Sequence, residues 1–366
     1  MPPLRIGIVG AGNISGIYLK NLGLFPSTEV VAVADLDVAR AREVADGAGI
    51  ANAMSTDELL AHPDVDLVLN LTIPAVHGQI ARRAIEAGKH VYNEKPLAID
   101  WDEAKGLMDL AESKGLKVGC APDTFLSAGQ QRVRNAIDAG RVGTPVHVQG
   151  FMLSGGPESW HPSPEFFYKK GAGPLMDMGP YYLTAYVNLF GPIKSVTSAT
   201  RATWNERTIG SEPMKGQKIA VEIPTTLIAA IEFHSGVIGQ LTVTFDAHGD
   251  FPNITVFGSE GILGVPDPNN FDGPTTLKAN GETETLDNAL PFAQNSRGIG
   301  VADLAASITE GRPNRASGAL ALHVLEAMIG IFESGATGRR VELTTKPERP
   351  APLGEGEFAA EAATLA

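Results

Sequence analysis

Near its start the chain reads Ile6-Gly7-Ile8-Val9-Gly10-Ala11-Gly12-Asn13-Ile14-Ser15-Gly16. An apolar strand that runs into a glycine loop and then a helix is typical of a dinucleotide-binding turn. Gly10 allows the tight turn, and Gly12 lets backbone N–H groups approach a pyrophosphate at the helix N-terminus. The third position of the pattern is Ser15 instead of glycine or alanine. The serine side chain is small enough for the turn. We therefore expect cofactor contacts from Gly10, Gly12, Asn13 and Ile14.

An acidic residue stands where this pattern requires one. Asp35 ends the second apolar run, 20 residues after Ser15. A carboxylate at that position accepts hydrogen bonds from the adenosine ribose. Because an aspartate also repels a 2′-phosphate, the sequence favours NAD over NADP.

The first 120 residues alternate between strand-like and helix-like periods. The strand-like runs are Leu4–Val9, Glu29–Ala34, Val65–Leu71, His90–Asn93 and Lys117–Cys120. The helix-like stretches between them are Asn13–Leu24, Asp37–Ala48, Ala75–Gly88 and Asp100–Lys114. The strands are almost continuously apolar, as expected when both faces of a sheet are covered. This alternation predicts an α/β, doubly wound parallel sheet, the Rossmann arrangement.

After about residue 145 the pattern changes to α+β. Strand-like runs with more alternation occur at Val146–Met152, Ile193–Thr203, Thr225–Phe233, Val237–Phe245 and Asn253–Phe257. Helices are expected near Leu126–Ala139, Leu175–Phe190, Val301–Glu310 and Gly318–Ser334. The alternation predicts a large, mainly antiparallel sheet with one packed face. We expect a Rossmann domain over 1–122, a second domain over 123–345 and an acidic, weakly packed tail over 346–366.

Composition excludes several classes of protein. Of 366 residues 43% are hydrophobic and 19% charged, which is ordinary for a globular chain. The net charge of −13 and the lack of a basic block argue against nucleic acid as a partner. The single cysteine, Cys120, excludes an intrachain disulfide and fits a reducing cytoplasm. We find neither a signal peptide nor an apolar run of 18 residues, so we expect a cytoplasmic protein without a membrane span.

Further motifs extend over most of the chain. They are Thr72-Ile73-Pro74-Ala75-Val76-His77, Gly88-Lys89-His90-Val91, Glu94-Lys95-Pro96 and Gly171-Ala172-Gly173-Pro174-Leu175-Met176-Asp177-Met178-Gly179. With the glycine loop and the Arg312–Ser334 region, they make the chain resemble the glucose–fructose oxidoreductase/inositol dehydrogenase/rhizopine-catabolism family (Gfo/Idh/MocA). The resemblance implies an NAD(P)-dependent oxidoreductase of sugars or polyols, a dimer or tetramer joined through the second sheet. It also implies cofactor contacts from Thr72, Ile73, Pro74, His77, Glu94 and Lys95.

The resemblance assigns the catalytic residues with one departure. The family motif Asp-x-Gly-x-His-x-x-Asp reads here Asp177-Met178-Gly179-Pro180-Tyr181-Tyr182-Leu183-Thr184. Tyrosine replaces the usual histidine, as in the glucose–fructose oxidoreductase branch. We expect Tyr181 to exchange the hydroxyl proton, Lys95 to polarise the same oxygen and Asp177 to orient Lys95 or a second hydroxyl. A free tyrosine titrates near pH 10, so this hypothesis needs the Lys95 ammonium to favour phenolate.

Other residues are candidates for the substrate site. Asp123 follows the last Rossmann strand and would bind a sugar hydroxyl, with helix capping as the alternative. In the aromatic loop 155–168, Trp160 and Tyr168 would stack on a sugar ring and His161 would donate to it, with a core plug under the loop as the alternative. His161 is also the second choice for the acid/base. The eight histidines form no ligand-spaced set, so we expect no metal.

Three functions follow from these observations. The leading one is NAD-dependent hydride transfer between nicotinamide and a hydroxyl carbon of a sugar, polyol or sugar derivative. The second is a redox-neutral, NAD-using glycosidase or lyase of the same family, and the third is a non-catalytic sugar-binding regulator. Retention of Lys95 and Asp177 argues against the third. The sequence does not identify the substrate.

Overall fold

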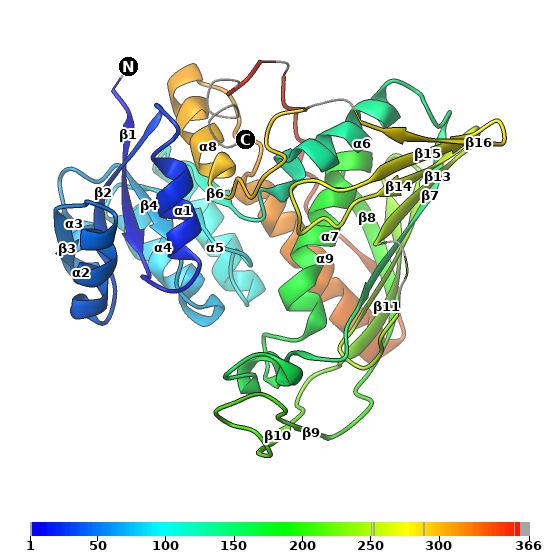
Figure 1. Cartoon of the computed structure of the whole chain (residues 1–366), viewed down its shortest axis with the longest axis horizontal. Coiled ribbons are helices and arrows are strands. Elements are labelled where there is room, and N and C mark those ends of the chain that lie inside the picture. Colours follow the sequence, from blue (N-terminus) through cyan, green and yellow to red (C-terminus); the bar gives the residue numbers. More distant parts are fainter. Residues whose placement is uncertain (1, 250, 252, 288–289, 355, 359–366) are drawn as a thin grey trace. The chain divides into compact units, whose positions relative to one another are not determined.

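The computed structural model describes residues 2–249, 251, 253–287, 290–354 and 356–358, which form two compact units (Figure 1). The first unit comprises the chain up to 128, 290–325 and 350 onward, and the second comprises 129–289 and 326–349. The expected boundary at 122 lies close to residue 128, where the chain first passes from the first unit to the second. The expected contiguous second domain and separate tail differ from the structure, because two later segments return to the first unit.

The first unit contains a six-stranded parallel sheet in the order β3-β2-β1-β4-β5-β6, as a doubly wound fold requires. Its strands are β1 (Leu4–Val9), β2 (Thr28–Ala34), β3 (Asn52–Met54), β4 (Leu67–Asn70), β5 (His90–Asn93) and β6 (Val118–Cys120). Its helices are α1 (Ser15–Leu22), α2 (Val38–Gly47), α3 (Thr56–Ala61), α4 (His77–Glu86) and α5 (Trp101–Ser113), with short 3₁₀ turns at Pro74–Val76 and Thr124–Leu126. The predicted Rossmann arrangement is confirmed.

Helix α8 (Ile299–Glu310) completes the first unit and packs near β6 (Figure 1). Its Asp303 is fully buried, and Oδ1 accepts from Nη1 of Arg315 at 2.5 Å while Arg312 lies within ion-pair distance at 2.9 Å. Arg315 also donates to the carbonyl oxygens of Ala351 and Pro352, each at 3.2 Å. The segment expected to be a weakly packed tail is therefore held to α8 over its described part.

The second unit is built on a nine-stranded sheet in the order β16-β15-β14-β13-β7-β12-β11-β8-β17. All of its pairings are antiparallel except that of β7 with β12. The strands are β7 (Pro145–Leu153), β8 (Ile193–Arg201), β11 (Thr226–Phe233), β12 (Ile238–Thr244), β13 (Ile254–Gly258), β14 (Gly261–Val265), β15 (Thr275–Ala279), β16 (Glu282–Leu286) and β17 (Val341–Glu342). The predicted mainly antiparallel sheet is confirmed.

Helices α6 (Ala128–Asp138) and α7 (Pro174–Phe190) accompany this sheet, as does α9 (Gly318–Thr337) from Glu326 onward. A small hairpin of β9 (Glu206–Thr208) and β10 (Lys218–Ala220) lies apart from it, with 3₁₀ turns at Pro157–Ser159 and Glu165–Tyr168. Along β11 the side chains of Leu227, Ala229, Ile231 and Phe233 are buried, whereas Ile228 is half exposed. One face of the sheet is therefore packed and the other is open in this chain.

Helix α9 is long and apolar enough to cross a membrane by composition, with a mean hydropathy of 1.4 over its best window. Half of that window is buried, and core helices of globular proteins meet the same criterion. Its Glu326 accepts hydrogen bonds from the hydroxyls of Thr344 at 2.6 Å and Thr345 at 2.5 Å. These contacts hold α9 to the segment that follows β17.

Candidate functional site

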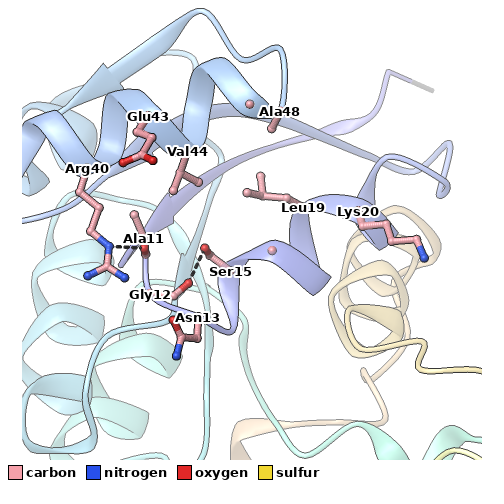
Figure 2. A pocket seen from close by; sticks show the side chains of 12 residues that line it. Ala11, Gly12, Asn13, Ser15, Leu19, Lys20, Arg40, Glu43, Val44 and Ala48 are labelled. Atoms are coloured by element: carbon pink, nitrogen blue, oxygen red, sulfur yellow. Dashed lines mark hydrogen bonds between the residues drawn. The ribbon is translucent and has the colours of Figure 1, made fainter. Parts of the chain in front are cut away.

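The glycine loop joins β1 to α1, and its glycines serve different purposes. Gly10 has a φ of 104°, and a Cβ there would lie 2.7 Å from the backbone of Leu71. A Cβ on Gly12 would meet nothing within 4 Å. Ser15 is buried and its hydroxyl donates to the Gly12 carbonyl at 2.7 Å (Figure 2). Gly10 is thus required by the backbone, whereas Gly12 keeps space open beside the loop.

A groove of about 680 Å³ runs along the carboxyl ends of β1, β2 and β4. It is lined by Gly10, Gly12, Asp35, Thr72 and Ile73, all predicted to contact the cofactor, and also by Leu36, Arg40, Val76 and Arg83. A second depression of about 710 Å³ lies between α1 and α2 and includes Asn13 (Figure 2). The groove occupies the edge where doubly wound sheets bind ligands.

Asp35 is tied to the glycine loop. Its Oδ2 accepts from the Ala11 N–H at 2.7 Å and its Oδ1 from the Asp37 N–H at 3.0 Å. Ala11 is also held by Arg40 of α2, whose Nε donates to the Ala11 carbonyl at 2.7 Å (Figure 2). The carboxylate therefore fixes the loop and still lines the groove where a ribose is expected.

A buried amide network holds the ends of β4 and β5 together. Nδ2 of Asn70 donates to Oδ1 of Asn93 at 3.0 Å, and Oδ1 of Asn70 accepts from the Thr72 hydroxyl at 2.6 Å. Asn93 donates in turn to the Leu97 carbonyl at 3.0 Å. Both asparagines are fully buried. The network therefore fixes the loops that follow β4 and β5 relative to each other.

His77 belongs to this network. The ring is 1% exposed, and its nitrogens lie 2.7 Å from the Pro96 carbonyl oxygen and 3.0 Å from that of Thr72. A neutral imidazole carries one N–H, so one of these two contacts is a hydrogen bond at a time. The ring faces two loop carbonyls and has almost no exposed surface, so a contact of the His77 ring with the cofactor has no support here and the expected cofactor contact of this residue stays a prediction.

Lys95 follows β5 in a loop held on both sides. Oε1 of Glu94 accepts from the Tyr18 hydroxyl at 2.8 Å, and Oε2 accepts from the Lys95 N–H at 2.9 Å. Burial and the Glu94 carboxylate raise the pKa of Tyr18 well above its usual value, so Tyr18 stays a donor. Lys95 is partly exposed at the carboxyl edge of the sheet. Glu94 acts here as an anchor of the Lys95 loop.

Ile14 and Pro74 are absent from the lining of both hollows, so their cofactor contacts stay predictions.

Asp123 has the alternative role that the sequence left open. It is 1% exposed, and its Oδ2 accepts from the N–H groups of Gly298 at 2.8 Å and Gly300 at 3.0 Å. These are the first amides of α8, so Asp123 caps a helix that lies 175 residues further along the chain. Burial raises the pKa of this carboxyl. A sugar contact by Asp123 has no exposed surface to support it.

In the second unit, Asp177 and Tyr181 lie one turn apart on α7, as predicted. The helix begins at Pro174 and passes through Pro180 without ending. A Cβ on Gly179 would lie 2.9 Å from Leu175 and 3.2 Å from Met328, so this glycine lets α7 pack closely against α9. Asp177 is partly exposed and Tyr181 is 8% exposed.

Two neighbouring tyrosines fix the rotation of α7. Tyr182 donates to the Phe151 carbonyl of β7 at 3.0 Å, and Tyr186 donates to the Gln240 carbonyl of β12 at 2.9 Å. Successive helical residues point about 100° apart. The stripe of Tyr182 and Tyr186 therefore faces the sheet, and the stripe of Asp177 and Tyr181 points away from those two anchors.

The aromatic loop divides into exposed and buried parts. Trp160 is 66% exposed and meets the His161 ring edge-on at 5.4 Å. Nδ1 of His161 accepts from the Ser163 N–H at 3.0 Å, which leaves Nε2 as the atom for any exchange. Tyr168 is fully buried and donates to Glu158. Stacking of Tyr168 on a sugar is therefore wrong for this structure; it is the core plug.

A buried ion cluster supports this loop. Arg207 of β9 donates to Oε1 of Glu158 at 2.6 Å and to Oδ1 of Asp246 at 3.0 Å, and all three side chains are at most 10% exposed. Oδ2 of Asp246 also accepts from Thr225 at 2.6 Å. The cluster ties the aromatic loop and the β9–β10 hairpin to the end of β12.

Other chemistry has little support. Burial raises the pKa of Cys120 well above its usual value, which argues against a reactive thiol. Within the described ranges, no three His, Cys, Asp or Glu side chains gather closely enough to hold a metal ion.

The sequence did not single out Arg40 or the Asn70–Asn93 pair. A basic residue five positions after Asp35, on the first turns of α2, is a signal that would have indicated Arg40. The amide pair had no such signal, because the two residues are 23 positions apart and meet only through strand pairing.

A dinucleotide groove on a doubly wound sheet, joined in one chain to a large open sheet, defines a class of two-domain oxidoreductases. The family model "Oxidoreductase family, NAD-binding Rossmann fold" matches residues 4–121, and the "GFO/IDH/MocA C-terminal domain" matches residues 130–264. Together these models cover more than half of the chain, which belongs to the Gfo/Idh/MocA family. Its NAD-binding Rossmann domain identifies NAD as the cofactor.

Individual relatives are more distant. An uncharacterized oxidoreductase of Schizosaccharomyces pombe is 29% identical over 61% of this chain and 64% of its own length. The scyllo-inositol 2-dehydrogenase (NAD(+)) of Bacillus subtilis is 28% identical over 71% of this chain and 73% of its own. The solved structure of levoglucosan dehydrogenase with NADH and levoglucosan has a TM-score of 0.80 at 22% identity, covering 94% of this chain and all of that one.

Proposed function

We propose that the protein is an NAD-dependent dehydrogenase that transfers hydride between the nicotinamide and a hydroxyl carbon of a sugar, polyol or sugar derivative. The observation that carries the proposal is the Lys95 loop, which is held by Glu94, Asn93 and His77 at the same sheet edge as the groove. Two of the relatives, scyllo-inositol 2-dehydrogenase and levoglucosan dehydrogenase, are named for an inositol and an anhydrosugar, which supports this substrate class.

The residues fit the cofactor. Gly12 leaves open space at the glycine loop, the first helical amides of α1 have no side-chain cap, and Asp35 lines the groove. When bound, NAD supplies the hydride acceptor. The chain must then bind the alcohol, remove its hydroxyl proton and stabilise the oxygen while the proton leaves.

We assign these tasks as follows. Tyr181 exchanges the hydroxyl proton, the Lys95 ammonium polarises the same oxygen, and Asp177 orients Lys95 or a second hydroxyl. From tyrosine in place of the family histidine we infer that the chain belongs to a tyrosine branch of the family. His161 remains the second choice for the proton exchange, and Trp160 offers an exposed ring for a sugar face.

Single-turnover kinetics of Lys95→Met, Tyr181→Phe and Asp177→Asn test these roles. We expect Lys95→Met and Tyr181→Phe to lower kcat by about 10²-fold or more, the usual range for a general acid or base. NADH binding should persist in Tyr181→Phe and Asp177→Asn. If His161→Gln lowered kcat by about 10²-fold while Tyr181→Phe left kcat unchanged, the proton exchange would be reassigned to His161.

A further inference from the structure

The groove contains a cation that the first unit does not neutralise. Four charged side chains line it: Asp35, Arg40, Asp57 and Arg83. Arg83 and Asp57 form an ion pair with each other. Among the described residues, neither Asp35 nor Arg40 has an ion-pair partner within 4.0 Å, the other included. One carboxylate and one guanidinium therefore face the adenosine end of the groove independently.

Arg40 is held so that its charge stays available. Nε donates to the Ala11 carbonyl, which fixes the guanidinium beside the glycine loop. In Figure 2 the dashed line to Ala11 starts at Nε of Arg40, and neither terminal nitrogen carries one. These nitrogens have no protein acceptor in the part of the chain that the structure describes. Arg42, two residues along α2, is different because it bonds to Asp46 and to the Ala51 carbonyl.

The Asp35 carboxylate is already hydrogen-bonded to the protein backbone, which binding of a ribose does not require. Each of its oxygens already accepts a backbone N–H, one from Ala11 and one from Asp37. Part of the acceptor capacity of the carboxylate is therefore already used by the protein before a ribose binds. An arginine near this position accommodates the 2′-phosphate of NADP in dinucleotide-binding folds, and a guanidinium matches a phosphate with two parallel hydrogen bonds.

We propose that the terminal nitrogens of Arg40 form a binding site for the 2′-phosphate, so that the protein takes NADP in addition to NAD. This inference rests on the groove being the dinucleotide site. It modifies the sequence argument in which Asp35 alone decides the cofactor: Asp35 holds the ribose and the loop, and Arg40 offsets its repulsion of a phosphate.

Isothermal titration calorimetry of the full chain with NADH and NADPH, without substrate, tests the proposal. We expect NADPH to bind within about 100-fold of NADH. Arg40→Met should weaken NADPH at least about tenfold more than NADH, the loss of one charge-assisted hydrogen bond. Arg42→Met is the matched control and should change neither affinity. Binding of NADH without NADPH, or equal weakening of both by Arg40→Met, would overturn the inference. Failure of NADH itself to bind would overturn the proposed function.

A second pair of variants keeps the test independent of any loop change in Arg40→Met. Asp35→Ser removes the repelling carboxylate and should raise the affinity for NADPH relative to NADH. Adding Arg40→Met to that variant should cancel most of the gain. A gain that persists in the double variant would show that Arg40 does not hold the phosphate.

Discussion

At the residue scale, two glycines of one loop have separable roles. Gly10→Ala places a Cβ against the Leu71 backbone at a φ of 104°, so we expect a loss of about 1–3 kcal/mol in the free energy of unfolding. Gly12→Ala places its Cβ in open space, so stability should change by less than about 1 kcal/mol while NADH affinity falls about tenfold. Urea unfolding and NADH titration of both variants check this. Full NADH affinity in Gly12→Ala would contradict a pyrophosphate at that loop.

The Asn70 amide is a second residue-scale test. Asn70→Ala removes the hydrogen-bond partner of the buried Asn93 Oδ1 and of the Thr72 hydroxyl. Unsatisfied buried polar groups are costly, so the free energy of unfolding should fall by about 2–4 kcal/mol. Asn52→Ala, which removes one exposed hydrogen bond to the Val31 carbonyl, should cost less than about 1 kcal/mol in the same urea titration. Equal effects would mean that the network does not stabilise the β4 and β5 ends.

At the element scale, Glu326 links α9 to the segment after β17. Burial alone raises the pKa of its carboxyl, but hydrogen bonds from Thr344 and Thr345 outweigh this and lower it. A lowered folded-state pKa stabilises the protein above the unfolded value, about 4.3, and this contribution is lost as the pH falls through the folded value. Glu326→Gln should therefore cost about 1–2 kcal/mol at neutral pH and much less near pH 3.

Urea unfolding of Glu326→Gln at both pH values checks this sign. Glu333→Gln, an exposed substitution on the same helix, is the control and should have no effect at either pH. A cost that is unchanged at low pH would show that the Glu326 charge does not stabilise the contact.

Elements also show what the sequence could predict. β1 and β5 match their expected bounds because buried parallel strands are continuously apolar. β3 was missed because Asn52–Met54 is an edge strand of only three residues. α3 was missed although Ser55 and Glu58 form a capping box, a signal present in the sequence. Strands β14–β17, each two to five residues long, were also missed.

At the scale of the whole molecule, sequence order does not reveal which segments fold together. α8 joins the first unit through hydrogen bonds from its amides to Asp123 and through Asp303 with Arg315. These contacts join residues that no local pattern connects, so the expected domain limits at 122 and 345 were too simple. For the same reason the sequence offered helix capping as a role for Asp123 but did not indicate that the capped helix is α8.

The open face of the second sheet predicts an oligomer, as the family resemblance implies. Ile228 and Ile238 are 50% and 48% exposed on this face. We expect light scattering to show a dimer or tetramer, and Ile228→Glu to shift it to a smaller species. Val38→Glu, at a 45% exposed position of the first unit, should leave the assembly unchanged. A monomeric parent protein would exclude association through this sheet.

Nicotinamide absorbance during turnover distinguishes hydride transfer to NAD from redox-neutral chemistry. Purified protein is incubated with NAD and a panel of inositols, sugars and anhydrosugars, and both NADH and the oxidised product are quantified. The account predicts one NADH per substrate oxidised, and loss of this signal in Lys95→Met. Substrate consumption without net NADH would indicate a redox-neutral lyase or glycosidase and contradict the dehydrogenase assignment.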